Sequence, residues 1–334
     1  VDWSKTIKQG PVSNGFDYFY GISGSLDMHP YIWIENDRFV GECTVTNGFT
    51  RNGPAHKDFE AVDVLPGIAD KTVEYIKKQS PDKPFFVYMA LTSPHAPIVP
   101  TEEFKGKSGI GNYGDFCVQT DAVVGQVLRA LAEMKLADNT LVIFTSDNGC
   151  SSTANIEDLK AKGHYPSYVF RGKKSEIYEG GHRIPFVVRW PGKVPAESSS
   201  DEIICLTDLL GTCAALVGEE LPSNAGEDRY NILPALLGRK LPQPKREATV
   251  HHSSNGSFAI RKGKWKLILC PGSGGFGSSR ISKDELEDLP PIQLYDLEKD
   301  VAETTNLQAD HPEVVKELTA LLDKYKTEGR SVIR

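Results

Sequence analysis

The 334-residue sequence has few of the features that mark thiolate-metal, nucleic-acid or membrane proteins. Its six cysteines form no CxxC or Cys/His ligand pattern, so neither a zinc site nor thioredoxin-like chemistry is supported. The formal net charge of -7 gives a nucleic-acid partner no electrostatic support. No uninterrupted apolar run approaches the roughly 20 residues of a transmembrane helix, because Asp208 breaks the best candidate, residues 203–217. With 39% apolar and 25% charged residues, the composition is that of a globular protein.

The sequence also shows no targeting signal. It begins with VDWSKTIKQGP, which contains no Met, no basic stretch and no apolar stretch. We therefore expect it to be a processed product or a fragment of a longer chain. The sequence leaves the oligomeric state open.

Two kinds of apolar segment alternate in the first 245 residues. Three segments have helical spacing, namely 62–79, 115–136 and 206–217. Three short apolar runs are typical of buried strands, namely 84–91, 141–146 and 184–190. This alternation predicts a layered α/β core with a mostly parallel sheet flanked by helices. In such sheets ligands bind beyond the carboxyl ends of the strands.

The pattern changes after residue 245. Short strand-like runs surround a tight turn at Gly263, which predicts a hairpin, and residues 311–326 have helical spacing. We therefore predict two domains, an α/β domain over 1–245 and a small α+β domain with an antiparallel sheet over 246–334. The basic run RKGKWK (261–266) favours a solvated hairpin edge protected by lysines over a polyanion site.

Polar residues follow the strand predicted at 141–146. Asp147 and Asn148 offer a carboxylate and an amide oxygen, which are hard donors suited to Ca²⁺ or Mg²⁺. Two ligands do not fill a calcium shell, so others must come from elsewhere. An ordinary turn would also explain the pair, because Asp, Asn and Gly149 all tolerate turn geometry.

Two further segments carry residues suited to catalysis. Lys173 and Lys174 precede the turn at Gly180-Gly181, and His95 lies in the proline-rich loop SPHAPIVP. A rigid loop is a good mount for a group that must point at a substrate. Taken singly, each has an ordinary explanation as a solvated lysine pair, a turn or a loop histidine.

Together, the order and spacing of these motifs resemble those of the sulfatase family, within the alkaline-phosphatase-like superfamily. The matching stretches are GFDYFYG (15–21), SPHAPIVP, FTSDNG, GKKSEIYEGGHRIPFVVRWPG, AIRKGKWKLI and LYDLEKDVAETTNL (294–307). The resemblance implies that the 1–245 domain is the remainder of a sulfatase catalytic domain. It implies that Asp147 and Asn148 are the second pair of calcium ligands. It also implies that Lys174, four residues before Tyr178, contacts the sulfate, with Lys173 as its neighbour, and that His95 lies near the leaving oxygen.

The implied chemistry suits these residue types. Cleavage of a sulfate ester places negative charge on the leaving oxygen and on the transferred group, which a divalent cation and fixed positive donors stabilise. Lysine acts as a point charge and could donate a proton, and His95 is the alternative proton donor. Glu179 and Arg183 are expected to brace the Gly-Gly turn. His164 and the His251-His252 pair are candidates for lining a substrate pocket, with His252 preferred.

The sequence departs from the family in one respect. No cysteine or serine lies in a C/S-x-P-S-R motif, the source of the formylglycine nucleophile, and the early Asp-Asp calcium pair is absent. We therefore expect the nucleophile to lie upstream of Val1 and the 334-residue chain alone to be inactive.

Three functions stay open at this point. The first is hydrolysis of sulfate esters, for which the resemblance implies sulfated carbohydrates as substrates and a secreted, periplasmic or lysosomal location. The second is phosphoester or phosphonate hydrolysis by a member of the same superfamily. The third is carbohydrate binding without turnover.

Overall fold

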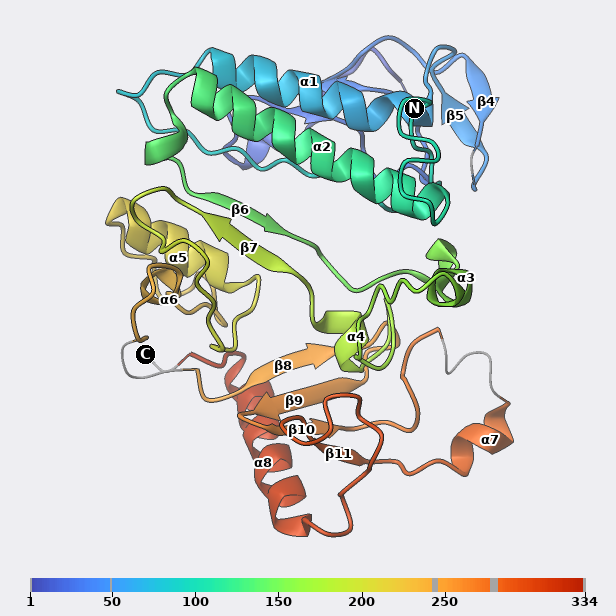
Figure 1. Ribbon diagram of the computed structural model, residues 1–334, viewed down its shortest axis with the longest axis vertical. Helices are drawn as coiled ribbons and strands as arrows, with labels where there is room; N and C mark the ends of the chain where they lie inside the picture. Colours follow the sequence, from blue (N-terminus) through green and yellow to red (C-terminus); the bar gives the residue numbers. More distant parts are fainter. Residues whose placement is uncertain (1, 49, 242–245, 277–281, 333–334) are drawn as a thin grey trace. The chain divides into compact units, whose positions relative to one another are not determined.

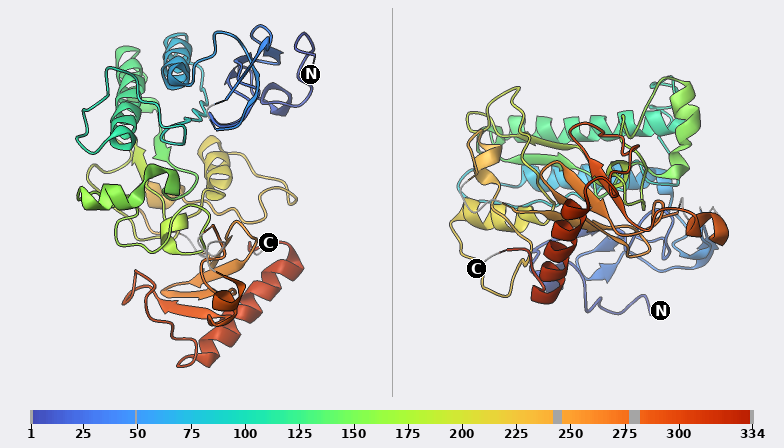
Figure 2. Two further views of the ribbon diagram at one scale, coloured as in Figure 1. Left: turned by 90° about the vertical axis from the view of Figure 1, so that its right-hand side faces the viewer. Right: turned by 90° about the horizontal axis from the view of Figure 1, so that it is seen from below.

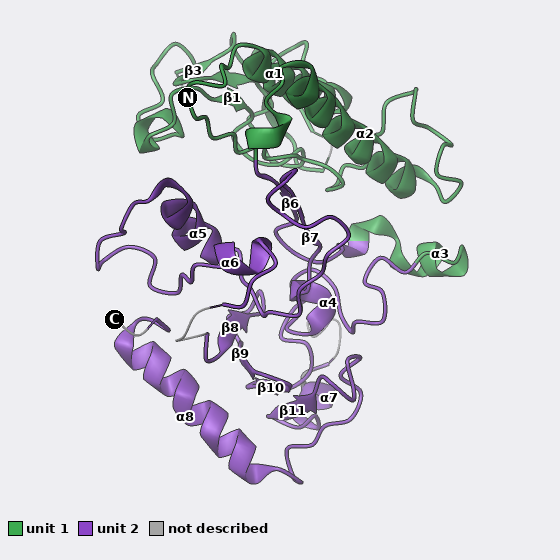
Figure 3. Cartoon of the chain, turned by 60° about the vertical axis from the view of Figure 1, so that its left-hand side comes forward, with its two compact units in different colours: residues 1–140, 153–164 green, residues 141–152, 165–334 purple. Residues whose placement is uncertain are grey.

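The computed structural model describes residues 2–48, 50–241, 246–276 and 282–332. The chain divides into two compact units (Figure 3): Val1–Thr140 with Thr153–His164, and Leu141–Ser152 with Tyr165–Arg334. The division predicted at residue 245 stays a prediction. None of the helices in the described part of the chain combines the length and apolar character that a membrane crossing requires.

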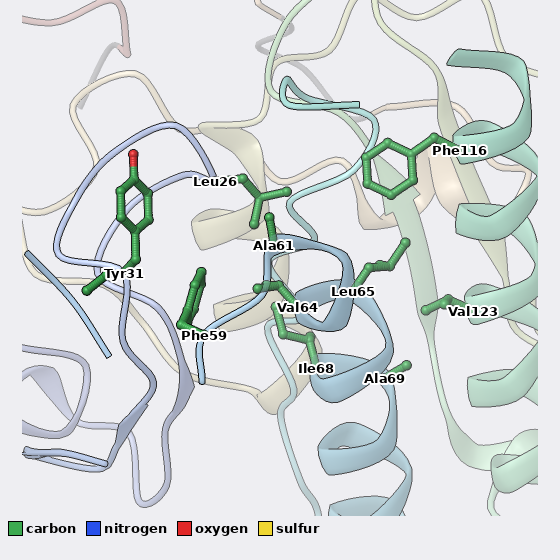
Figure 4. Close-up of a cluster of buried hydrophobic side chains, with 11 residues drawn as sticks. Leu26, Tyr31, Phe59, Ala61, Val64, Leu65, Ile68, Ala69, Phe116 and Val123 are labelled. Atoms are coloured by element: carbon green, nitrogen blue, oxygen red, sulfur yellow. The ribbon is translucent and has the colours of Figure 1, made fainter. Parts of the chain in front are cut away.

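The first unit is built around two helices, α1 (Val64–Lys77) and α2 (Asn112–Glu133), which fall where helical spacing predicts them. Its other elements are short: 3-10 turns at Val12–Asn14, Ala61–Asp63 and Ala137–Asn139, helix α3 (Ile156–Ala161), the sheet β1 (Tyr20–Gly21), β2 (Ile34–Glu35) and β3 (Arg38–Phe39), and the pair β4 (Val45–Asn47) and β5 (Gly53–Ala55). The buried faces of α1 and α2 meet in one apolar cluster (Figure 4), which includes Leu65, Phe116 and Val123.

The strand predicted over 84–91 is wrong. The structure describes all of these residues and assigns no strand to them. Met89 and Leu91 pack against the apolar cluster, whereas Phe86 and Tyr88 are 65% and 74% exposed. The alternation of a strand is therefore present, but no hydrogen-bonded strand partner for it lies within the described residues.

The second unit begins with the strand pair β6 (Val142–Thr145) and β7 (Phe186–Arg189), close to the ranges predicted. The two strands are antiparallel, and Thr145 lies opposite Phe186. Every ladder among the described residues is antiparallel, so the mostly parallel sheet stays a prediction. The short helices of this unit are α4 (Glu179–His182), α5 (Asp208–Val217), α6 (Leu233–Leu236) and α7 (Lys283–Glu287). The 3-10 turn Ser152–Ala154 has its first residue in this unit and its other two in the first unit.

The predicted antiparallel sheet of the C-terminal region is confirmed. Its strands are β8 (Thr249–His252), β9 (Phe258–Lys262), β10 (Trp265–Ile268) and β11 (Gln293–Asp296), in the order β11-β10-β9-β8. Helix α8 (Pro312–Glu328) lies along one face (Figure 1, Figure 2), where Leu318 and Leu322 pack on Ile260 and Leu267. The neighbouring residues along each strand point to the opposite face of the sheet, where Ala259 and Ile268 pack with Ile177 and Tyr178.

The basic run in this sheet corrects one prediction. Strands β9 and β10 are the two inner strands, so the hairpin is not a sheet edge. Lys262 and Lys264 do reach solvent, but the side chain of Lys266 is fully buried on the face opposite α8.

Candidate active site

The turn after β6 presents two oxygen donors. The Ser146 hydroxyl donates to the carbonyl of Asn148 at 3.0 Å, and the Asn148 side-chain NH₂ donates to the carbonyl of Gly149 at 3.1 Å. These bonds fix the turn and leave the Asn148 Oδ1 available as a donor to a cation. Asp147 is exposed, and its carboxylate has no hydrogen bond or ion pair within the described residues.

Glycines allow this turn to pack directly on the backbone of a second turn. The Gly149 amide donates to the carbonyl of Gly181 at 3.0 Å. A Cβ on Gly149 would lie 1.8 Å from the carbonyl oxygen of Gly180, and a Cβ on Gly180 would lie 2.4 Å from that of Gly172. No side chain fits at either position, so the glycines of DNG and EGG are required by the contact between the two turns.

Residues 171–179, here called the lysine loop, run beside the same turn. The Lys174 amide donates to the carbonyl of Cys150 at 2.8 Å, and the Gly180 amide closes the loop onto the carbonyl of Arg171 at 2.7 Å. Lys173 and Lys174 are half-buried, and neither ammonium group has an ion-pair partner among the described residues. Backbone hydrogen bonds therefore join the segment that carries Lys173 and Lys174 to the turn that carries Asp147 and Asn148.

The end of β8 also reaches the lysine loop. His252 is the last residue of β8 and is exposed, with its Nδ1 2.9 Å from the carbonyl of Ser253. Two residues later, the Ser254 amide donates to the carbonyl of Ser175 at 2.9 Å. His252 thus lies close to the loop that carries the two lysines, which is compatible with a contact to a ligand bound there.

The neighbouring histidine has a different environment. The Nε2 of His251 lies 3.2 Å from the carbonyl of Ile177, and its ring centroid is 4.2 Å from that of His182. Burial lowers the pKa of His251, and the nearby Lys266 charge lowers it further. The same two causes lower the pKa of His182 to about 4. Both rings are therefore neutral packing groups at ordinary pH.

His95 and His164 belong to the first unit. His95 lies in a tight turn, with its amide donating to the carbonyl of Thr92 at 3.1 Å and its Nδ1 2.6 Å from the carbonyl of Ala96. Burial raises the pKa of Asp27, but the Ser25 hydrogen bond and the charge of nearby His95 outweigh burial and lower it. His164 follows α3, and its amide donates to the carbonyl of Leu159. The roles of both histidines at the site stay predictions.

A buried ion cluster holds the EGG turn from behind. The Glu179 carboxylate pairs with Lys266 at 3.0 Å, with Arg261 at 3.3 Å and with Arg183 at 3.7 Å. Burial alone would raise the pKa of Glu179, but these cations outweigh it and lower the value. Glu179 and Arg183 thus brace the turn as expected. Sequence reasoning missed Lys266 and its second partner, Glu303, at 2.8 Å.

Asp147 and Asn148 fit a hard cation by their donor chemistry. Among the residues that the structure describes, the exposed Asp147 carboxylate has no hydrogen bond or ion pair, and the Asn148 amide oxygen accepts none while its NH₂ is held by Gly149. Within the described residues no group of three or more His, Cys, Asp or Glu side chains could hold a metal ion. The calcium site predicted at Asp147 and Asn148 therefore stays a prediction.

Comparisons with known proteins identify the family of this chain. The Sulfatase family model matches residues 3–219. The chain is 33% identical to N-acetylgalactosamine-6-O-sulfatase of Bacteroides thetaiotaomicron, over 98% of this chain and 71% of the relative. It is 29% identical to human N-acetylgalactosamine-6-sulfatase, over 95% of this chain and 62% of the relative.

A solved structure described under the metabolism of multiple glycosaminoglycans by Bacteroides thetaiotaomicron superposes with a TM-score of 0.83. It shares 32% identity, and the match covers 98% of this chain and 76% of that one. The chain thus spans between about three fifths and three quarters of the length of these relatives. The relatives are named as sulfatases, which are sulfuric ester hydrolases. Both the extent of the family match and the identity to a relative show that this chain belongs to the sulfatase family.

Proposed function

We propose that the protein hydrolyses sulfate esters of carbohydrates at the site formed by Asp147, Asn148, Lys173 and Lys174. The observation that carries this proposal is the contact between the DNG and EGG turns, in which Gly149 donates to Gly181 and Lys174 donates to Cys150. This backbone contact supports the proposal because it joins the segment that carries the two lysines to the turn that carries the hard oxygen donors, and a sulfate monoester requires both kinds of group.

Each residue has a defined role in the proposal. Lys174 binds a sulfate oxygen as a point charge, with Lys173 as a second positive group, and His95 supplies or holds the proton of the leaving oxygen. Asp147 and Asn148 would hold Ca²⁺, or Mg²⁺ in its place. When bound, that ion supplies positive charge that draws the sulfate oxygens and polarises the ester. His164 and His252 contact the sugar.

The nucleophile is proposed to lie outside these 334 residues. The sequence contains no C/S-x-P-S-R motif, and the relatives named above are longer than this chain. A formylglycine in the remaining part of the protein would complete the site, so the 334-residue chain by itself is expected to be inactive.

The substrate proposed is a saccharide that carries a 6-O-sulfated N-acetylgalactosamine. The support for this choice is that the bacterial relative is named an N-acetylgalactosamine-6-O-sulfatase and the human relative an N-acetylgalactosamine-6-sulfatase. A secreted, periplasmic or lysosomal location is proposed from the family resemblance alone.

Kinetics of the full-length protein test the proposal. The substrate is N-acetylgalactosamine 6-sulfate, with the 6-phosphate as the competing ester. We expect Lys174→Ala to lower kcat/KM by on the order of 10²-fold, because one charged donor is lost at the transition state. Lys193→Ala removes an exposed lysine of the same unit and should leave kcat/KM unchanged. Faster turnover of the phosphate, or full activity of Lys174→Ala, would contradict the proposal.

Metal dependence gives a second test. Asp147→Asn keeps the size of the side chain and removes its charge, so we expect weaker Ca²⁺ binding by calorimetry together with loss of turnover. Chelation of the wild-type protein should abolish turnover, and added Ca²⁺ should restore it. Retention of tight Ca²⁺ binding by Asp147→Asn would show that the ion is held elsewhere.

A further inference from the structure

Glu303 has an unusual combination of backbone and side-chain environment. Its side chain is fully buried, and its φ of +54° lies in the left-handed region that non-glycine residues seldom occupy. Such a conformation persists only where the surroundings determine it strongly, and it is often associated with functional sites. Burial raises the pKa of Glu303, although the Lys266 charge opposes the shift.

The contacts of Glu303 converge on the two ends of the lysine loop. Its Oε2 accepts the amide of Glu179 at 2.7 Å, at the end of the loop. Its backbone carbonyl accepts Nη1 of Arg171 at 2.8 Å, at the start of the loop. The Arg171 guanidinium in turn lies over the ring of Tyr178, 4.0 Å from its centroid.

Ion pairs connect Glu303 to the C-terminal sheet. Lys266 Nζ lies between the two carboxylates, 3.0 Å from Glu179 and 2.8 Å from Glu303. Its register partner on β9 is Arg261, which pairs with Glu179 from the same face of the sheet. Strands β9 and β10 thus supply two cations to the two glutamates, in addition to the pair of Glu179 with Arg183.

A role in stability alone explains this cluster poorly. A buried ion pair is weak support for stability, because packed apolar residues of similar volume often serve as well or better. Here the ion pairs hold a strained residue whose bonds go to both ends of one loop. A positioning role accounts for the strain and for the direction of the bonds together.

We propose that Glu303 is a positioning residue, which sets the lysine loop and thereby the direction of the Lys174 ammonium. This inference rests on the proposed function for the role of Lys174. Glu303 and Lys266 lie beyond residues 3–219, the range matched by the family model, so the C-terminal sheet contributes to the site through them.

A double-mutant cycle in the full-length protein tests whether Glu303 acts through Lys174. Glu303→Gln keeps the length of the side chain and an acceptor for the Glu179 amide but removes the charge that pairs with Lys266. We expect it to lower kcat/KM by on the order of tenfold or more in the wild-type background. In the Lys174→Ala background it should cause less than a twofold further loss, because the group that it positions is gone.

A matched control uses the same chemistry on the other face of the sheet. Glu317→Gln breaks an exposed pair with Lys262, 2.8 Å apart, and should leave kcat/KM unchanged. Should Glu303→Gln fail to fold, Arg171→Gln replaces it, because Arg171 is exposed and its bond to the Glu303 carbonyl anchors the other end of the loop. Equal losses in the wild-type and Lys174→Ala backgrounds would overturn the proposal.

Hydrogen exchange gives a readout that does not require turnover. We expect Glu303→Gln to speed amide exchange by about tenfold in residues 171–181, while exchange in β9 stays at its wild-type rate. Unchanged exchange in the lysine loop, or faster exchange throughout the sheet, would overturn the positioning role. If no sulfate ester is turned over by the wild-type protein, the proposed function fails, and exchange still decides whether Glu303 holds the loop.

Discussion

The two faces of the C-terminal sheet are built from the same strands but differ in character. Under α8, Ile260 and Leu267 form an apolar core with Leu318 and Leu322. On the opposite face, the adjacent residues Arg261 and Lys266 pair with Glu179 and Glu303. Because side chains alternate along a strand, one face of the sheet packs on α8 through apolar contacts, while the other holds the lysine loop through ion pairs and through the contact of Ala259 and Ile268 with Ile177 and Tyr178. We therefore expect the face under α8 to contribute mainly to the free energy of unfolding and the opposite face to contribute to the geometry of the candidate site as well.

Removing the central cation should have the largest effect. Lys266→Met leaves Glu179 and Glu303 buried and facing each other without their shared ammonium group. We expect a loss of about 3–5 kcal/mol in the free energy of unfolding, the range for breaking a buried ion pair on one side. Urea denaturation measures the loss, and hydrogen exchange should show faster exchange in the lysine loop as well. A loss below about 1 kcal/mol would mean that the two carboxylates take up protons with little penalty.

An apolar truncation on the other face sharpens the comparison. Leu318→Ala removes a fully buried side chain from the contact between α8 and the sheet. We expect a loss of about 3 kcal/mol, from lost burial and the cavity left behind. Unlike Lys266→Met, it should leave kcat/KM and the relative exchange rates in residues 171–181 unchanged. A selective effect on the lysine loop would show that the two faces are not independent.

Acid should weaken the charged face selectively. The unfolded chain protonates His182 near pH 6.5, whereas the folded protein holds its pKa at about 4, chiefly through burial and then through Lys266. The folded protein holds His182 in its neutral form, so its stability is complete above pH 6.5. As the pH falls toward 4, the unfolded chain takes up a proton that the folded protein does not, and stability is lost. The shift corresponds to roughly 3 kcal/mol, and His251 acts in the same direction.

Urea denaturation between pH 7 and pH 4 measures this slope. His182→Gln should flatten it, because the group that takes up the proton on unfolding is absent. His252→Gln changes the exposed neighbour of His251 on β8 and should leave the slope close to that of the wild type. An identical slope in wild type and His182→Gln would assign the acid sensitivity to other groups.

Part of this arrangement could be predicted from the sequence. Helical spacing locates α1, α2, α5 and α8, and Gly263 marks the β9–β10 turn. The DNG and EGG motifs indicate the two turns of the candidate site, because their glycines are required by a backbone contact. These features depend on local pattern or on motif order, both of which a single sequence carries.

The remainder depends on distant partners. Lys266 sits in a basic run that is typical of an exposed hairpin, and only its alternation with Leu267 hints that it faces inward. Its burial depends on Glu179 and Glu303, residues 87 and 37 positions away, which local patterns do not reveal. Likewise, the apolar run at 84–91 has strand alternation, but a ladder requires a second strand.

The smallest effect is expected at the exposed ion pairs of the same sheet. Lys262 lies next to Arg261 in the chain but points to the α8 side, where it contacts Glu247 and Glu317. Both carboxylates are exposed, so solvent screens the attraction and the ordering of long side chains offsets it. We expect Lys262→Met to change the free energy of unfolding by less than about 1 kcal/mol. Lys262→Met and Lys266→Met make the same substitution in one hairpin, at an exposed and at a buried ion pair. Equal losses of the free energy of unfolding would mean that burial of the ion pair does not increase its contribution to stability.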